Sequence, residues 1–254
     1  MSVTTFWRAL TWVRERFFPP ACFVCSRLLD LYDGKERTSA LCRECAARWE
    51  KEKQETCPIC ALPIASCECM NEEMQKMGCR HLRRLVYYRK GVGDPVQNRL
   101  IYRFKYRRSR RTAEFLAREL LPALASLMEE EGMTPENTLL VPIPRSRAAY
   151  LEHGTDQAEA LAGALSRVSG IPMRRIFLHR GGKAPMQKEL SAEERMKNAA
   201  RAYRLQRGVS VKGYHVVLLD DIVTTGATMC ACARRIRRRG VLGIHCLAIA
   251  SDDL

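Results

Sequence analysis

The sequence lacks any long apolar run. No stretch of about 18 consecutive apolar residues occurs, so the sequence predicts no membrane-spanning helix. It also lacks the apolar core of a secretory signal, because Arg8 and Arg14 interrupt its opening segment. Apolar residues recur there at helical spacing, which predicts an amphipathic helix within residues 1–20 that docks on the protein rather than on a membrane surface. We expect a cytoplasmic protein.

Acidic residues are scarce relative to basic ones. The chain has 43 Lys and Arg against 28 Asp and Glu, a formal net charge of +15. Residues 1–80 are almost balanced, with 12 basic and 11 acidic side chains, whereas residues 81–254 have 31 and 17. The excess positive charge of the larger segment predicts a polyanionic or phosphorylated partner there.

Twelve cysteines without a signal sequence indicate a reducing compartment and metal binding rather than disulfide bonds. Eight of them form close pairs: Cys22 and Cys25, Cys42 and Cys45, Cys57 and Cys60, and Cys67 and Cys69. Two such pairs complete a tetrahedral site of four thiolates, so residues 21–80 predict a double zinc ribbon with a structural role. Sequential and cross-braced pairing both use these residues. Cys79 is an alternative ligand to the last, tighter pair, and an iron–sulfur cluster is the alternative metal group.

Residues 81–254 alternate between predicted strands and helices, which indicates a mainly parallel sheet with helices on both faces. Strands are expected at 84–88, 139–144, 176–178, 216–219 and 243–250. We expect Thr112 to cap one helix, Thr155 or Asp156 to cap the next, and Ser191 with Glu194 to open a third.

A phosphate-binding loop is predicted between the strand at 216–219 and the helix that follows it. Its polar residues are Thr224, Thr225 and Thr228, and Gly226 allows close approach of the backbone to a ligand. Asp220 and Asp221 come just before this loop, where a pair of carboxylates suits a sugar diol or a divalent cation. The alternative is that the two aspartates only end a strand and cap a helix.

Further polar residues follow other predicted strands. Arg145 and Arg147 come after the strand at 139–144 and suit a pyrophosphate. The segment from Arg180 to Gln187 is rich in glycine and charge, so we expect it to close over a ligand with Lys183 and Gln187. His153 is interpreted as a surface residue rather than an acid or base.

Basic and aromatic residues alternate between residues 102 and 111. Six of the nine residues from Arg103 to Arg111 are basic, and Tyr102, Phe104 and Tyr106 lie among them. This composition suits single-stranded nucleic acid, whose bases stack on aromatic rings and whose phosphates pair with cations. The alternative is a helix with an aromatic core face and a solvated basic face.

The run from Val216 to Met229 resembles the 5-phosphoribosyl-1-pyrophosphate (PRPP) motif of type I phosphoribosyltransferases. The whole chain resembles the ComF family, phosphoribosyltransferase-like proteins with an N-terminal double zinc ribbon. This resemblance covers residues 22–250 and rests on the cysteine pairs, Phe104-Lys105-Tyr106, Val141-Pro142-Ile143-Pro144, Gly154 with Gln157, Arg180 with Gln187, the Leu190-Ser191, Arg195 and Asn198 pattern, and the PRPP loop. The chain departs from the family in the tight spacing of Cys67 and Cys69, and at His153, Thr155, Asp156, Gly182 and Ala184.

The resemblance implies a fold of three parts: the helix at 1–20, the ribbon at 21–80 and a type I phosphoribosyltransferase-like domain at 81–254. It implies that the loop Thr224, Thr225, Gly226, Ala227 and Thr228 holds the 5-phosphate of PRPP, Asp220 and Asp221 its ribose, and Arg145 and Arg147 its pyrophosphate. Mg²⁺ accompanies PRPP, and the implied catalytic residues are Asp220, Asp221, Lys183 and Gln187.

Family members are implicated in natural transformation, in which they handle single-stranded DNA in the cytoplasm, so competence-machinery proteins are expected partners. Two alternatives to that role remain at this point. One is a non-catalytic module that senses PRPP and binds nucleic acid, and the other is a nucleobase phosphoribosyltransferase of salvage.

Overall fold

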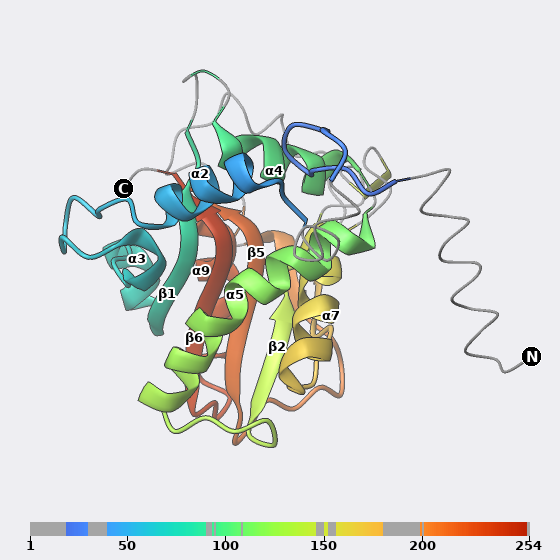
Figure 1. Ribbon diagram of the computed structural model, residues 1–254. Helices are drawn as coiled ribbons and strands as arrows, with labels where there is room; N and C mark the ends of the chain where they lie inside the picture. Colours follow the sequence, from blue (N-terminus) through green and yellow to red (C-terminus); the bar gives the residue numbers. More distant parts are fainter. Residues whose placement is uncertain are drawn as a thin grey trace, which may run out of the picture.

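Four strands form a parallel sheet in the order β1-β6-β5-β2 (Figure 1). The computed structural model describes residues 19–29, 40–89, 93, 95–107, 109–145, 150–151, 156–179, 199 and 201–252. The sheet strands are β1 (Cys79–Tyr87), β2 (Thr138–Pro142), β5 (His215–Val223) and β6 (Gly243–Ser251). The predicted parallel sheet is therefore confirmed. Because the strands are parallel, their carboxyl ends meet at one edge, where ligands bind in such sheets.

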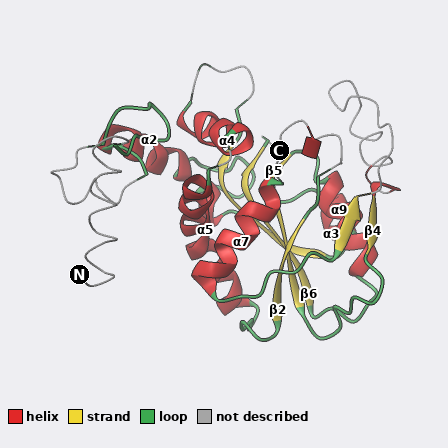
Figure 2. Ribbon diagram, turned by 90° about the vertical axis from the view of Figure 1, so that its right-hand side faces the viewer, coloured by secondary structure: helices red, strands yellow, loops and turns green. Residues whose placement is uncertain are grey.

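Helices cover both faces of the sheet (Figure 2). The helices are α2 (Arg43–Lys53), α3 (Glu72–Lys76), α4 (Val96–Tyr106), α5 (Arg110–Glu130), α7 (Gln157–Ser169), α9 (Ala227–Ile236) and the 3-10 turn η1 (Ile64–Ser66). Helices α5 and α7 bury one face with Val217 and Leu219 of β5. Helix α9 and the short α3 bury the other face with Val216 and Leu218. Residues 216–219 of β5 therefore alternate between the two faces of the sheet, and all four are buried, as a central parallel strand requires.

Two helix starts test the predicted caps. The side chain of Asp156 accepts a hydrogen bond from the Glu159 N–H and caps α7, as predicted. Thr112 is not a cap. Helix α5 begins at Arg110, and the Ser109 hydroxyl accepts from the Thr112 N–H instead. Ser109 and Thr112 are both suitable N-cap residues, and the two arginines between them gave no sign that the helix begins before Thr112.

The predicted strand at 176–178 is real but lies outside the parallel sheet. It is observed as β3 (Phe177–His179) and pairs antiparallel with β4 (Tyr203–Leu205), which the sequence pattern did not predict. Strand β1 starts at Cys79, five residues before its predicted start at Arg84. None of the described helices has the length and apolar composition that a membrane crossing requires.

Several predicted features lie outside the described residues. They are the helix within residues 1–20 as far as residue 18, Arg147, His153 to Thr155, and the segment 180–198 with Lys183, Gln187, Ser191 and Glu194.

Candidate functional site

The predicted phosphate loop connects β5 to α9 at the carboxyl edge of the sheet. Gly226 is the N-cap of α9 and has φ of +67°, a conformation that favours glycine. Thr224 is exposed, and Thr225 and Thr228 are half-buried. The first N–H groups of a helix lack carbonyl partners within the helix, so this end offers several donors and a partial positive charge. The local geometry suits a phosphate.

Asp220 and Asp221 lie near the end of β5 before the loop, since the strand continues through Val223 rather than ending at Leu219. The Asp221 N–H donates to Asp220 Oδ1 at 2.8 Å, and the Ile222 N–H donates to Asp221 Oδ1 at 2.7 Å. These bonds hold both carboxyl groups against the backbone. Desolvation raises the pKa of Asp220 well above its usual range, and the negative charge of Asp221 raises it further.

Two cations face the acidic pair. Arg145 Nη2 lies 2.6 Å from Asp221 Oδ2, and Lys105 Nζ lies 3.7 Å from the same oxygen. Arg145 follows β2, and its backbone N–H donates to Asp156 Oδ2 at 3.0 Å, which links it to the start of α7. The structure thus brings Arg145 together with the acidic pair. Sequence reasoning counted Lys105 only among the basic residues predicted to bind nucleic acid and in the Phe104-Lys105-Tyr106 motif, and gave it no role beside the acidic pair.

The eight cysteines form two groups in sequential order. In each group the sulfur atoms lie within 4.8 Å of one another: Cys22, Cys25, Cys42 and Cys45 in the first cluster, and Cys57, Cys60, Cys67 and Cys69 in the second cluster. Cys79 lies outside both groups, and the tight last pair joins the second. The Sγ atoms of Cys25 and Cys42 are 3.8 Å apart and those of Cys60 and Cys67 are 3.5 Å apart. Tetrahedral zinc with Zn–S bonds of ~2.3 Å needs about 3.8 Å, so the geometry fits zinc.

The chemistry of these thiols also fits a metal. Burial would raise the pKa of the Cys22 thiol, but the backbone N–H groups of Cys25, Cys42 and Val24 lower it to about 7. Backbone N–H groups likewise lower the pKa of Cys57 to about 6 against the same effect of burial. Arg84 is fully buried, and its Nη2 lies 3.3 Å from Cys67 Sγ. A buried guanidinium needs a negative partner, and four thiolates around a zinc ion would supply one.

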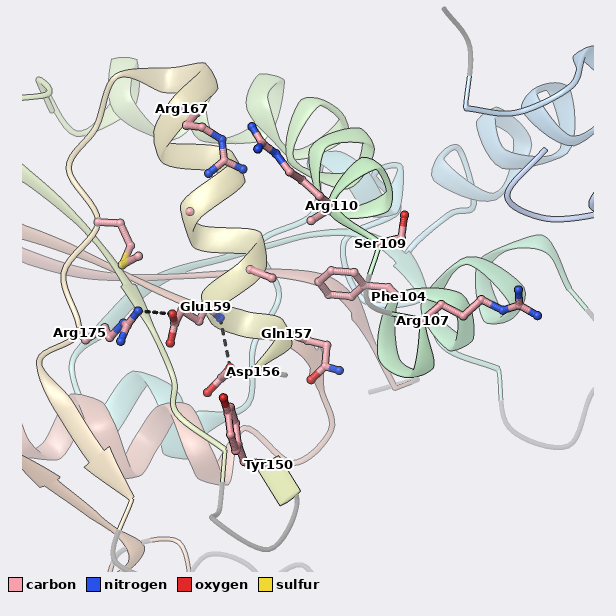
Figure 3. Close-up of a pocket in the computed structure, with 14 residues that line it drawn as sticks. Phe104, Arg107, Ser109, Arg110, Tyr150, Asp156, Gln157, Glu159, Arg167 and Arg175 are labelled. Carbon is pink, nitrogen blue, oxygen red and sulfur yellow. Dashed lines mark hydrogen bonds and ion pairs between the residues drawn. The ribbon is translucent and has the colours of Figure 1, made fainter. Parts of the chain in front are cut away.

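A basic groove lies between α4, α5 and α7 (Figure 3). Its volume is about 750 Å³, and four arginines outnumber two acids in its lining. Glu159 pairs with one of these arginines, Arg175. The lining includes Phe104, Arg107, Arg110, Asp156, Gln157, Glu159, Arg167 and Arg175. Arg107 and Arg110 belong to the predicted basic stretch. Arg167 and Arg175 come from α7 and the segment after it, so the sequence could not assign them to this groove. Arg107 also lines a neighbouring hollow of about 380 Å³ beside Phe23 and Tyr102.

The aromatic residues of α4 were interpreted either as a surface for nucleic acid or as the core face of a helix, and the structure shows some of each. Phe104 is buried in the core, as the structural alternative expects. Tyr102 and Tyr106 are 63% and 53% exposed, and their ring centroids are 4.5 Å apart. Two of the three aromatic rings therefore lie on the surface beside the basic side chains, an arrangement that suits base stacking.

Comparison with known proteins finds a phosphoribosyl transferase domain and similarity to DNA utilization and competence proteins. Residues 156–253 match the phosphoribosyl transferase domain family, a span that includes the acidic pair and the loop. The DNA utilization protein YhgH of Salmonella typhimurium is 29% identical over 232 residues, which cover 89% of this chain and 95% of that protein. The competence protein ComFC of Bacillus subtilis is 24% identical and covers 79% of each chain. Competence protein F of Haemophilus influenzae is 30% identical, over 59% of this chain and 66% of its own.

Proposed function

Since this chain belongs to the ComF family, we propose that it binds PRPP with Mg²⁺ at the edge of its sheet and acts on DNA during its uptake or use. The observation that carries the proposal is the acidic pair Asp220 and Asp221 directly before a glycine-capped helix N-terminus. An acceptor pair beside a phosphate loop matches the two ends of a ribose 5-phosphate.

Binding would rearrange the ion pair between Arg145 and Asp221. A ribose diol donates hydrogen bonds, so it satisfies carboxylate oxygens in place of the guanidinium. A pyrophosphate offers that guanidinium, and the ammonium of Lys105, new negative partners. PRPP therefore offers a new partner to both Asp221 and Arg145, which limits the free-energy cost of breaking their ion pair.

Mg²⁺ would arrive with PRPP and neutralise its pyrophosphate, and Asp220 and Asp221 are the carboxylates that would hold it or the ribose. As an enzyme, the protein would let a nucleophile attack the anomeric carbon while pyrophosphate leaves with the bonding electrons. The chain would contribute positioning and charge stabilisation, with Lys183 and Gln187 closing over the ligand. Without turnover, the same site would sense PRPP.

Calorimetry of the zinc-replete protein with PRPP and Mg²⁺ tests this proposal. We expect saturable heat for the wild type and its loss in Asp220→Ala/Asp221→Ala, because the diol loses both acceptors. Absence of binding in the wild type, or unchanged binding in the double variant, would overturn it. Pyrophosphate release with candidate nucleobases then separates an enzyme of salvage or DNA metabolism from a sensor.

The basic groove favours single-stranded DNA as a second ligand. Arg107, Arg110, Arg167 and Arg175 gather on one side of the molecule, near the exposed rings of Tyr102 and Tyr106 on α4. We expect affinity for an oligonucleotide to fall steeply with salt. Neutralising Arg107, Arg108, Arg110 and Arg111 should weaken binding and reduce the salt slope by about 0.7 for each phosphate that the variant no longer neutralises. An unchanged slope would remove this surface from the proposal.

A further inference from the structure

Asn71 connects the segment after the second cluster to the phosphate loop. Its Oδ1 accepts a hydrogen bond from the Met74 N–H at 3.0 Å and thereby caps α3. Its Nδ2 donates to the backbone carbonyl of Thr225 at 2.9 Å. One side chain therefore satisfies a helix start and also holds a peptide group of the loop, although 154 residues separate Asn71 from Thr225.

The held peptide group is the one that presents a donor to the ligand. Thr225 C=O and Gly226 N–H belong to the same trans peptide unit, so they point in opposite directions. Because Asn71 fixes the carbonyl on the α3 side, the Gly226 N–H is directed away from α3. That orientation adds this N–H to the donors at the start of α9, where a phosphate binds.

Met74 closes the same side of the loop by packing. It is almost fully buried, and a Cβ built on Gly226 would lie 2.6 Å from its Sδ and 2.8 Å from its Cγ. The loop thus rests directly on α3 and cannot shift toward it. At the other end of α3, Arg237 Nη1 donates to the Lys76 carbonyl at 2.9 Å, so α3 and α9 are tied at both ends.

The second cluster fixes the position of Asn71. Cys69 precedes Asn71 by two residues, and its carbonyl accepts a hydrogen bond from Arg84 Nη1 at 2.8 Å. The same guanidinium contacts Cys67 Sγ. Strand β1 therefore anchors the end of the cluster, and the chain leaves it directly toward the loop.

We propose that Asn71 is a positioning residue that orients the peptide unit between Thr225 and Gly226 for a ligand phosphate, so that the fold of the second cluster controls affinity for PRPP. This inference takes PRPP as the ligand from the proposed function. The hydrogen bond between Asn71 and the Thr225 carbonyl does not depend on that function. Neither the family model, which starts at residue 156, nor the PRPP motif includes this residue.

Asn71→Ser isolates the contact with the loop. Serine is an equally good helix cap and adds no charge, but its side chain has no amide to reach the Thr225 carbonyl. We expect the Kd for PRPP, measured by calorimetry with Mg²⁺, to rise about tenfold, which corresponds to ~1.4 kcal/mol. Zinc content and oligonucleotide affinity should stay at wild-type values, whereas general damage to the fold would lower both.

Asn137→Ser is the matched control, because Asn137 Oδ1 likewise accepts a backbone N–H, that of Thr134 at 2.7 Å, before β2. It should leave PRPP affinity unchanged. Wild-type affinity in Asn71→Ser would overturn the inference. If the wild type itself gives no heat with PRPP, the proposed function fails, and amide hydrogen exchange then tests the role of Asn71. Faster exchange over residues 222–229 in Asn71→Ser supports that role, and unchanged exchange overturns it.

Discussion

The two cysteine clusters repeat one backbone pattern but attach to different parts of the molecule. In the first, the Cys22 N–H bonds to the Arg27 carbonyl and the Ser26 N–H bonds back to the Cys22 carbonyl. In the second, Cys57 bonds to Leu62 and Ala61 bonds back to Cys57 in the same way. The shared pattern follows from the need to aim two sulfurs at one metal ion.

The first cluster attaches to the helices that form the basic groove. Phe23 meets Phe115 of α5 edge-on, with ring centroids 6.2 Å apart, and the guanidinium of Arg103 lies over the Phe23 ring. Trp49 of α2 is buried and donates to Glu119 of α5 at 2.7 Å. This cluster therefore fixes α4 and α5, which carry the predicted nucleic acid surface.

The second cluster attaches to β1 and, through Asn71, to the phosphate loop. Cys57 and Cys67 pack with Tyr87 of β1, and Arg84 lies beside them. The comparison teaches that the same metal-binding pattern supports two surfaces. One cluster supports the helices of the groove, and the other supports the loop at the sheet edge.

Removing one thiolate from each cluster should give the largest and most informative effect. Cys25 and Cys60 occupy equivalent positions in the two turns, so Cys25→Ser and Cys60→Ser form a matched pair. Each should lose the zinc of its own cluster, about half of the total, because a structural site needs all four ligands. We expect Cys60→Ser to lower PRPP affinity more than tenfold, and Cys25→Ser to weaken oligonucleotide binding instead.

Metal content, calorimetry and a salt-controlled oligonucleotide titration measure these outcomes on the same preparations. Equal losses of both ligands in both variants would show that the clusters only maintain the fold as a whole. Retention of full zinc content by either variant would contradict the assignment of its cysteine as a ligand.

The arginine beside each cluster provides a second comparison with a smaller expected effect. Arg84→Met removes a fully buried cation next to Cys67 and should destabilise the protein by about 3 kcal/mol if four thiolates carry negative charge there. Arg103→Met removes a half-buried cation from the Phe23 ring and should cost about 1 kcal/mol. Chemical denaturation of zinc-replete protein measures both. A neutral or stabilising Arg84→Met would indicate uncharged thiols in the second cluster.

Features formed by neighbouring residues could be predicted from the sequence. Strand β5, the loop rich in Thr and Gly, and helix α9 follow one another in the sequence. Four apolar residues followed by turn residues were therefore enough to predict all three. The paired cysteines identified both clusters for the same reason, and the structure supports sequential over cross-braced pairing.

Features that depend on distant partners could not be predicted. The part of β1 before the predicted start at Arg84 contains Arg80, His81 and Arg83, a polar run that resembles a surface loop. In the structure Arg83 pairs with Glu130 at the end of α5 and is only 6% exposed. The charge is buried because its partner arrives from a helix far along the chain, which no local pattern records.

The site shows the same division. The acidic pair and the loop residues were identified from one short run, and the structure keeps them together. Lys105 and Asn71 reach that run from α4 and from the cysteine-rich segment, so their roles depend on the tertiary fold.

The smallest predicted effect tests whether the two turns are equivalent in energy as well as in pattern. Ser26 and Ala61 each follow the second cysteine of a turn and have φ of 60° and 57°, where a side chain costs about 1–2 kcal/mol. Glycine removes that cost but makes the unfolded chain more flexible, so Ser26→Gly and Ala61→Gly should each stabilise by only about 0.5–1 kcal/mol. Because the turns lie in separate clusters, the double variant should show the sum of both effects. Thermal unfolding of zinc-replete protein measures the three variants, and a gain in one turn with a loss in the other would contradict their equivalence.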